Sequence, residues 1–310
     1  MSLSVAAGVT MANRRSVTIE RIGYTGVLMP APATTIYDFG ANNGDDLPYY
    51  LKKADRVVAV EANPELCAQI RARFVDAIAG GRLIVENVVI TEDEHDRAVP
   101  FYLSKEHHVL GQFPRPAEDR RHEFEEVGLP AKSVAQLVAQ HGTPHYVKVD
   151  LEGYDETVLR ALFLSGHRPP YISSEAHTPG PFGLLVGLGG YDAFKLLDGR
   201  SVAQQYEHRE IATNNGPERY SFPMHSAGPF GDDVDGPWLT ASRLLTQLAV
   251  DGLGWKDIHA TTQAVADPDT RPVLKARDVA SLFARHVVAP RLPSSLAHAA
   301  QRSWRRLKRG

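Results

Sequence analysis

The chain has 310 residues, of which 43% are hydrophobic and 23% charged, so it is long enough for one large globular domain or for a domain with an appendage. Its formal net charge of −3 gives no general attraction to nucleic acid or to anionic membranes, and we expect no nucleic-acid partner. A single cysteine excludes an internal disulfide, and no apolar run is long enough to span a bilayer, so the sequence predicts a cytoplasmic protein.

Strands and helices alternate along the first two thirds of the sequence. The predicted strands are apolar and β-branched, as in strands buried on both faces of a sheet, and lie at 34–39, 56–62, 82–90, 145–153 and 169–177. Helical patterns follow at 45–53, 63–81, 133–142 and 154–166, and 98–104 is predicted as an inserted strand. This alternation predicts an α/β fold with a mostly parallel sheet.

The pattern becomes looser after residue 177. A strand is predicted near 193–198, and 225–238 contains too many glycines and prolines for regular structure. Helical patterns follow, so we divide the chain into an N-terminal extension (1–30), a sheet domain (31–240) and a helical C-terminal region (241–310). The C-terminal region ends in the basic tail QRSWRRLKRG, for which we expect a solvated helix end or, as the alternative, contact with an anionic membrane surface or a partner.

The turn after the first predicted strand reads D-x-G-x-N-x-G, with Asp38, Gly40, Asn42 and Gly44. Its glycines allow close backbone approach, as in a phosphate-binding turn. Asp38 and the two acids at 45–46 would repel a pyrophosphate, by roughly 4 kcal/mol for unit charges 4 Å apart at intermediate dielectric. The turn is therefore suited to a ligand without phosphate and with positive charge.

Glu61 stands at the end of the second predicted strand. An acid at this place commonly accepts hydrogen bonds from the ribose hydroxyls of a nucleoside. Together with the acidic turn, it indicates a nucleoside that carries cationic groups, and S-adenosylmethionine has this chemistry.

The segments YDFGANNGDD (37–46), VVAVEANPE (57–65), ENVVITEDE (86–94) and VKVDLEGYDETVLRAL (147–162) together resemble the FkbM family of S-adenosylmethionine-dependent O-methyltransferases. The resemblance covers roughly residues 30–260. It implies a Rossmann-like, seven-stranded, mostly parallel sheet of the class I methyltransferase type. It also implies methyl transfer to a hydroxyl of a sugar, a glycan or a secondary metabolite, with that small-molecule or glycan acceptor as the main partner.

The resemblance also assigns cofactor-binding residues. It places the first turn at the methionine end, Glu61 and Ala62 at the ribose, Asn87 and Val88 beside the adenine, and Asp150 near the sulfonium and the acceptor. Asn63 either approaches the adenine or only caps the following helix. The complete predicted set is Asp38, Gly40, Ala41, Asn42, Gly44, Glu61, Ala62, Asn63, Asn87, Val88 and Asp150.

Methyl transfer to an alcohol needs a general base or a metal that lowers the pKa of the hydroxyl. The predicted catalytic residues are His177, Glu175, Asp150 and Glu152, which follow or end two neighbouring strands. We expect His177 to act as the base, oriented by Asp150 and Glu175, whereas Glu152 serves either chemistry or nearby backbone amides. The alternative is Mg²⁺ or another divalent cation held by Asp150, Glu175 and His177.

Two other functions stay open from the sequence. An NAD-dependent oxidoreductase would also bind a nucleoside at this sheet edge, but the acids of the first turn count against it. A nucleic-acid methyltransferase recruited by the basic tail is the other, and the low net charge counts against that. A homo-oligomer is compatible with the sequence.

Overall fold

In this computed structural model, the structure describes residues 34–93, 98–106, 111–272, 274, 279–280 and 283. The predicted N-terminal extension (1–30) and the basic tail lie outside the described residues. In the described part of the chain, no helix has the length and apolar character needed to cross a membrane.

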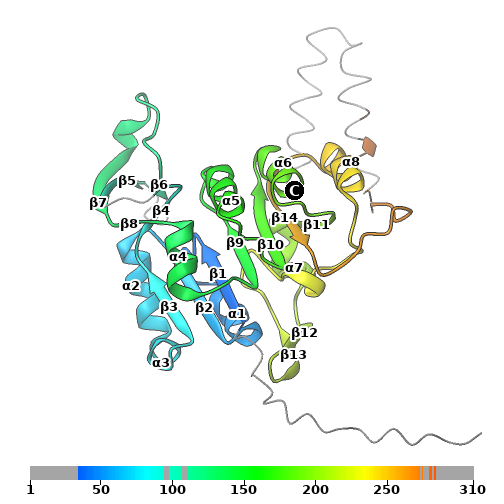
Figure 1. The fold of residues 1–310 in the computed structure, drawn as a ribbon, viewed down its shortest axis with the longest axis horizontal. Helices are drawn as coiled ribbons and strands as arrows, with labels where there is room; N and C mark the ends of the chain where they lie inside the picture. Colours follow the sequence, from blue (N-terminus) through cyan, green and yellow to red (C-terminus); the bar gives the residue numbers. More distant parts are fainter. Residues whose placement is uncertain are drawn as a thin grey trace, which may run out of the picture. The chain divides into compact units, whose positions relative to one another are not determined.

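A seven-stranded sheet forms the centre of the fold (Figure 1). Its order is β11-β14-β10-β9-β1-β2-β3, in which β14 is antiparallel to both neighbours and all the other pairings are parallel. The prediction of a seven-stranded, mostly parallel sheet is therefore confirmed. The strands are β1 (Thr35–Phe39), β2 (Arg56–Val60), β3 (Leu83–Glu86), β9 (Tyr146–Val149), β10 (Tyr171–Ala176), β11 (Ala193–Asp198) and β14 (Gly254–Thr261).

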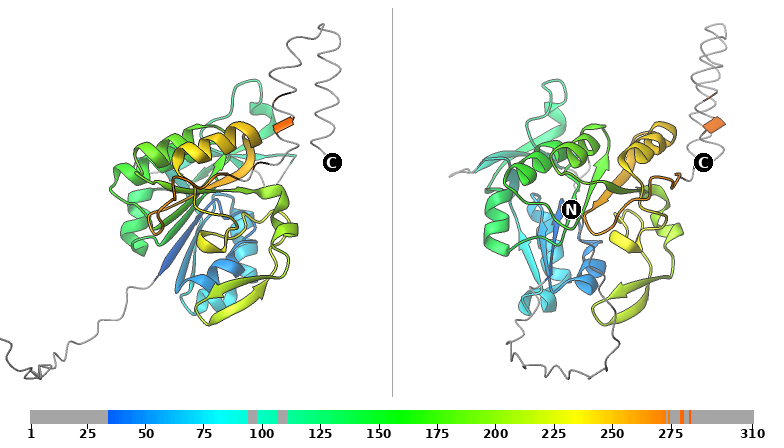
Figure 2. Two further views of the ribbon diagram at one scale, coloured as in Figure 1. Left: turned by 90° about the vertical axis from the view of Figure 1, so that its right-hand side faces the viewer. Right: turned by 45° about the vertical axis from the view of Figure 1, so that its right-hand side comes forward.

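Helices cover both faces of this sheet, so its strands are buried on both sides. Alternate residues of β1 enter different cores: Tyr37 and Phe39 belong to one apolar cluster and Ile36 to the other. The first cluster is completed by α4 (Val134–His141), α5 (Asp155–Leu164), α6 (Gly180–Gly187) and α8 (Ala241–Asp251). The second is completed by α1 (Leu47–Lys53), α2 (Pro64–Arg73) and α7 (Val202–Gln205), while α3 (Val75–Ala79) follows α2. In Figure 2 the green helices and the orange-yellow α8 lie on one face, and the blue helices lie on the other.

The sequence predicted one strand over 82–90, but the structure has two separate strands there. β3 ends at Glu86, and Val89–Thr91 forms β4, which pairs in parallel with β8 (Ala131–Ser133) in a separate two-stranded sheet. Between them, the Asn87 side-chain amide donates to the carbonyls of Glu61 (3.0 Å) and Ala62 (2.8 Å). These bonds hold residue 87 against the end of β2, and the chain leaves the main sheet there.

Two antiparallel elements are attached to the central sheet. The predicted strand at 98–104 is confirmed as β5 (Val99–Ser104), which joins β6 (Gly111–Gln112) and β7 (Phe124–Leu129) in a three-stranded sheet next to β4 and β8 (Figure 1). The hairpin of β12 (Arg209–Thr213) and β13 (Gly216–Tyr220) was not predicted, because its strands are short and largely polar. Ile211 of the hairpin packs into the second core cluster.

The C-terminal boundary of the sheet domain was predicted wrongly. Helix α8 confirms the start of a helical region, but Gly254–Thr261 is strand β14, which lies between β10 and β11 in the sheet. The sheet domain thus extends beyond residue 240 to at least 261, and a helical extension over 241–310 is not confirmed. The strand was not predicted because its composition is polar, with Lys256, Asp257 and His259, although most of it is buried.

The 225–238 segment contains no helix or strand except a short 3₁₀ turn, as predicted, yet it is part of the core. Phe230 is buried, and its ring stacks on that of Tyr146 with centroids 4.0 Å apart. Tyr50 and Tyr171 also lie against Phe230. The segment therefore closes the second core cluster over the middle of the sheet.

Replacing Phe230 with Ala should lower the free energy of unfolding by about 3–5 kcal/mol, because it removes a buried aromatic ring and leaves a cavity. Urea denaturation measures this loss. Met224→Ala in the same segment is the control, since Met224 is 71% exposed and should change stability by at most about 0.5 kcal/mol. A similar small effect of both substitutions would contradict the packing role of Phe230.

Candidate active site

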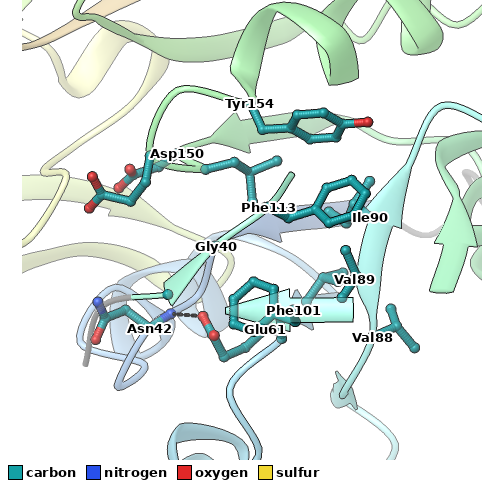
Figure 3. A pocket seen from close by; sticks show the side chains of 15 residues that line it. Gly40, Asn42, Glu61, Val88, Val89, Ile90, Phe101, Phe113, Asp150 and Tyr154 are labelled. Carbon is teal, nitrogen blue, oxygen red and sulfur yellow. Dashed lines mark hydrogen bonds between the residues drawn. The ribbon is translucent and has the colours of Figure 1, made fainter. Parts of the chain in front are cut away.

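A pocket lies at the carboxyl ends of β1, β2 and β9, where the following turns approach one another (Figure 3). One wall is polar and includes Asn42, Glu61 and Asp150, and the opposite wall is apolar. The lining residues are Gly40, Asn42, Val60, Glu61, Ala62, Val88, Val89, Ile90, Phe101, Gly111, Phe113, Asp150, Leu151, Glu152 and Tyr154. Ligands of open α/β sheets bind at this edge, as the sequence predicted.

Glu61 lies between the polar and the apolar wall. One carboxylate oxygen accepts from the backbone amide of Asn42 (2.9 Å) and the other from that of Asn63 (2.7 Å). Figure 3 shows the bond to Asn42. Burial raises the pKa of Glu61 to about 7, although these amides oppose the shift. Each oxygen keeps a second lone pair, so the carboxylate can still accept hydroxyl groups from a ligand.

The apolar wall is formed by β4 and by the inserted sheet. On this side of the pocket lie Val88, Val89 and Ile90, with Phe101 of β5 and Phe113 beside them (Figure 3). The Phe113 ring also meets Tyr154 edge to face, with centroids 5.0 Å apart. The result is a narrow slot that suits a flat aromatic base. The sequence did not identify these aromatic residues, because nothing local showed that the insertion folds back over the strand ends.

Several predicted cofactor residues support the pocket without lining it. Ala41 is buried, and its backbone amide donates to the Val60 carbonyl. A Cβ on Gly44 would collide with Leu47 and Ile70, so this glycine serves helix packing. Asn63 caps α2, and Asn87 holds the end of β2. Of the predicted cofactor residues, those that do line the pocket are Gly40, Asn42, Glu61, Ala62, Val88 and Asp150.

Gly40 is required by the backbone of the neighbouring strand. Its φ of +84° is in the region that favours glycine, and a Cβ there would overlap the carbonyl oxygen of Asp150. The turn after β1 and the end of β9 therefore touch directly. This contact brings the polar turn and Asp150 to one side of the pocket.

Beneath the turn lies the buried ammonium group of Lys148. Its Nζ is 3.2 Å from Asp150 Oδ2, 3.4 Å from Asp38 Oδ1 and 3.7 Å from Asp46 Oδ2. Burial alone would lower the pKa of Lys148, but these carboxylates raise it well above its usual value. The sequence did not reveal that three aspartates share this ammonium group.

Asp38 is fully buried, and in the described part of the chain neither of its carboxylate oxygens has a hydrogen-bond partner. Burial raises its pKa to about 7 against the attraction of Lys148. Its charged partner is the Lys148 ammonium group, 3.4 Å from Oδ1, and Asp38 does not line the pocket.

The two acids that follow Gly44 have partners within the protein. Asp46 accepts from the Ser226 hydroxyl and from the Ala227 amide (3.1 Å), besides pairing with Lys148. Asp45 pairs with Arg73 at 3.1 Å. The sequence-based argument treated both acids as charges that would repel a phosphate, but the structure shows that each already has a partner within the protein. They hold the turn in place, and Asp46 joins it to the 225–238 segment.

The predicted catalytic residues come together next to the pocket. His177 Nδ1 lies 3.0 Å from Glu175 Oε2, and Glu175 is hydrogen-bonded to Asp150. Burial, and then the charges of Asp150 and Asp257, raise the pKa of Glu175 to about 10. Glu152 lines the pocket with a φ of +51°, and burial followed by the Asp150 charge raises its pKa.

The structure does not support the predicted metal alternative at Asp150, Glu175 and His177. Among the described residues, no group of three His, Cys, Asp or Glu side chains is arranged to hold a metal ion.

The comparison with protein families decides between the open functions. The model described as the methyltransferase FkbM domain matches residues 38–213, which is more than half of the chain. The chain belongs to the FkbM methyltransferase family. The matched segment contains the D-x-G-x-N-x-G turn, Glu61 and the end of β9, which lie at this pocket. Membership of this family favours methyl transfer over the NAD-dependent oxidoreductase that the sequence left open.

Solved structures show weak similarity to this FkbM methyltransferase. A methyltransferase FkbM from Methylobacillus flagellatus is 16% identical with a TM-score of 0.32, over 49% of this chain and 35% of that one. A precorrin-6y C5,15-methyltransferase from Geobacter metallireducens is 13% identical with a TM-score of 0.28, over 53% and 63%. The chain thus spans about a third of the length of the first structure and less than two thirds of the length of the second. No curated protein sequence matches it.

Replacing Lys148 with Met should destabilise the FkbM methyltransferase by about 3–5 kcal/mol at pH 8, because buried aspartates then lose their cation. The loss should be smaller at pH 5. Folding raises the pKa of Asp38 from 3.8 to about 7. The protonated Asp38 side chain therefore stabilises the folded state fully below pH 4, and this contribution is lost as the pH rises through 7. At pH 5 it is already protonated in the wild type and needs no cation.

Urea denaturation at both pH values measures these losses. Lys52→Met is the matched control, because Lys52 pairs with Glu218 at the surface (2.6 Å) and should cost at most about 1 kcal/mol. Equal losses for Lys148→Met at pH 5 and pH 8 would contradict the shared ion pair.

Proposed function

We propose that the pocket binds S-adenosylmethionine and that the enzyme transfers its methyl group to a hydroxyl of a sugar, glycan or secondary-metabolite acceptor. The observation that carries this proposal is the position of Glu61. Its carboxylate lies where the polar turn meets the apolar slot, with lone pairs left over from its two backbone amides. A nucleoside needs such a group at the junction of base and ribose.

The other lining residues fit the remaining parts of this cofactor. Val88, Phe101 and Phe113 form the slot for the adenine, and the turn at Gly40 and Asn42 takes the amino-acid end. Asp38 and Lys148 form an ion pair beneath that turn, and Asp150, which also pairs with Lys148, lines the pocket where a cationic ligand would lie. When bound, the cofactor supplies a methyl group on a positively charged sulfur, so the protein mainly aligns the reactants.

The acceptor hydroxyl must lose its proton during transfer, and His177 is the proposed base. Glu175 donates a hydrogen bond to Asp150, and it accepts one from His177 Nδ1. This arrangement fixes the tautomer in which Nε2 carries a lone pair. The His177 side chain is 49% exposed, so Nε2 is accessible to an acceptor. Asp150 and Glu175 orient the base, and Glu152 lines the adjoining wall.

The charges around this site favour a neutral acceptor over nucleic acid. Asp150 and Glu152 are the acids near the proposed base, whereas the Lys148 ammonium group is buried and already shared by aspartates. A nucleic acid needs exposed Lys or Arg for its phosphates. A hydroxyl-rich small molecule or glycan meets no such charge repulsion.

The cofactor assignment is tested by isothermal titration with S-adenosylhomocysteine and with NAD. The wild type should bind the first and not the second. Glu61→Gln should weaken S-adenosylhomocysteine binding by about 10- to 100-fold, because it removes charged hydrogen bonds to the ribose. Glu65→Gln is the matched control, since Glu65 is exposed on the following helix. Binding of NAD alone would contradict the proposal.

The catalytic assignment is tested with methyl-labelled S-adenosylmethionine and a library of hydroxyl acceptors. His177→Ala should lower turnover by about 10²- to 10⁴-fold, the usual contribution of a general base, and leave S-adenosylhomocysteine affinity within about threefold. The exposed His122 provides the control substitution His122→Ala. EDTA should leave turnover unchanged. Turnover that is lost with EDTA and restored by Mg²⁺ would contradict the base mechanism.

A further inference from the structure

An aromatic pair stands at the sheet edge that holds the proposed base, and the proposed mechanism does not use it. The rings of His225 and Trp255 are nearly parallel, with centroids 5.8 Å apart and an interplanar angle of 18°. His225 is exposed and Trp255 is half-buried. Trp255 is the second residue of β14, which is antiparallel to β10 and so begins where β10 ends (Figure 1). Since His177 directly follows β10, the base and the indole lie at one edge on neighbouring strands.

The pairing of β14 with β10 is interrupted at Trp255. Glu175 is opposite Asp257 and Ala176 is opposite Gly254, so two residues of β14, the first of them Trp255, have no opposite residue in β10. Bulges of this kind re-aim side chains and are common beside active sites. Gly254 pairs with the residue that precedes the proposed base, across a strand spacing of about 4.8 Å. Trp255 is therefore one residue away from the immediate neighbourhood of that base.

The Trp255 indole presents both an apolar ring and a free donor. It lies against the backbone of Gly199, where a Cβ would overlap the ring. Among the residues that the structure describes, the indole N–H donates no hydrogen bond, and it is available to a ligand hydroxyl.

The backbone at His225 adopts a conformation that side chains rarely take. Its φ is +84°, and of the four described non-glycine residues with positive φ, two others line the cofactor pocket. Such strained positions cluster at ligand sites, where surrounding contacts hold them. Here the contact is made by the next residue, Ser226, whose hydroxyl donates to the Asp46 carboxylate at the start of α1. The imidazole is thus held beside the indole by a segment that belongs to the Lys148 network.

A pyranose ring matches these groups. The C–H bonds on one face of such a ring pack on the electron-rich face of an aromatic side chain, while its hydroxyls remain at the rim. The indole N–H and the exposed carboxylate of Glu152 are partners for those hydroxyls. A flat aromatic ligand is better matched by the slot of Phe101 and Phe113, which is apolar, than by a ring pair that is open to solvent and has acids nearby.

We propose that Trp255 and His225 form the acceptor subsite, and that the acceptor is a pyranose ring stacked on this pair with one hydroxyl directed at His177. This inference rests on the proposed function and narrows its acceptor to a sugar. The hydroxyl oxygen bonds to the methyl carbon as the carbon–sulfur bond breaks, and the electron pair of that bond passes to sulfur. Nε2 of His177 takes the hydroxyl proton.

The test is methyl transfer to a panel of methyl pyranosides, with catechol as a flat aromatic acceptor and sorbitol as an acyclic one. The wild type should methylate at least one pyranoside and neither of the other two. Trp255→Ala should raise KM for that pyranoside by about 10- to 30-fold and change kcat by less than about threefold, because stacking is equal in the ground and transition states. Trp255→Phe keeps an aromatic face and should hold KM within about threefold of the wild type.

His225→Gly separates ligand binding from folding. Glycine accepts a φ of +84°, so this variant should not lower the urea midpoint of unfolding. It removes the imidazole from the pair, so KM for the pyranoside should still rise by about 3- to 10-fold. If Trp255→Ala does not fold, this variant carries the test alone.

Trp238→Ala is the matched control. Trp238 is also half-buried, but the Lys195 ammonium group lies 4.5 Å from its ring centroid and its indole N–H donates to Asp232 (3.1 Å). The KM of this variant should stay within about twofold of the wild type. All variants should bind S-adenosylhomocysteine as the wild type does.

Unchanged KM values in Trp255→Ala and His225→Gly would overturn the subsite. Methylation of catechol or sorbitol without any pyranoside would overturn the sugar assignment, as would a wild type that binds S-adenosylhomocysteine and methylates no member of the panel. In these cases the proposed cofactor site stands. Failure of the wild type to bind S-adenosylhomocysteine would instead overturn the proposed function and this inference with it.

Discussion

The buried ammonium group of Lys148 is the interaction on which the site depends. It contacts the end of β1 through Asp38, the start of α1 through Asp46 and the end of β9 through its own neighbour Asp150. Asp46 extends this network to Ser226 and Ala227. A buried carboxylate without a cation is costly, so these segments hold one arrangement relative to each other. The turn and the group around His177 are therefore parts of one electrostatic unit.

This unit explains how one sheet edge combines two unlike walls. The strand ends β1 and β9 bring carboxyl groups and their shared cation to the polar wall, whereas β4 and the inserted sheet bring aliphatic and aromatic side chains to the other. Glu61 joins the walls through two backbone amides. The site is thus polar where a ligand carries charge and apolar where it carries a flat ring, which matches the two ends of an adenosine cofactor.

Local patterns were sufficient to predict the strands around β1, β2, β9 and β10 and the polar residues at their ends, because a buried parallel strand is a continuous apolar run. The sequence also identified Asp150, Glu175 and His177 as neighbours. Features that depend on distant segments were missed: the partners of Asp46, the slot aromatics Phe101 and Phe113, and strand β14. Polar residues gave β14 the composition of a surface segment, and only the assembled sheet explains their burial.

The position of β14 has a consequence for the order in which the chain can fold. This strand lies between β10 and β11 but is made after both, with α6, α7, the hairpin and α8 synthesised in the meantime. Until Gly254–Thr261 leaves the ribosome, β10 and β11 each have an edge with unpaired backbone groups. Exposed strand edges are templates for association with other chains. The growing chain therefore passes through a stage at which the strand that joins β11 to the rest of the sheet is missing, and at that stage it is exposed to aggregation and to chaperones.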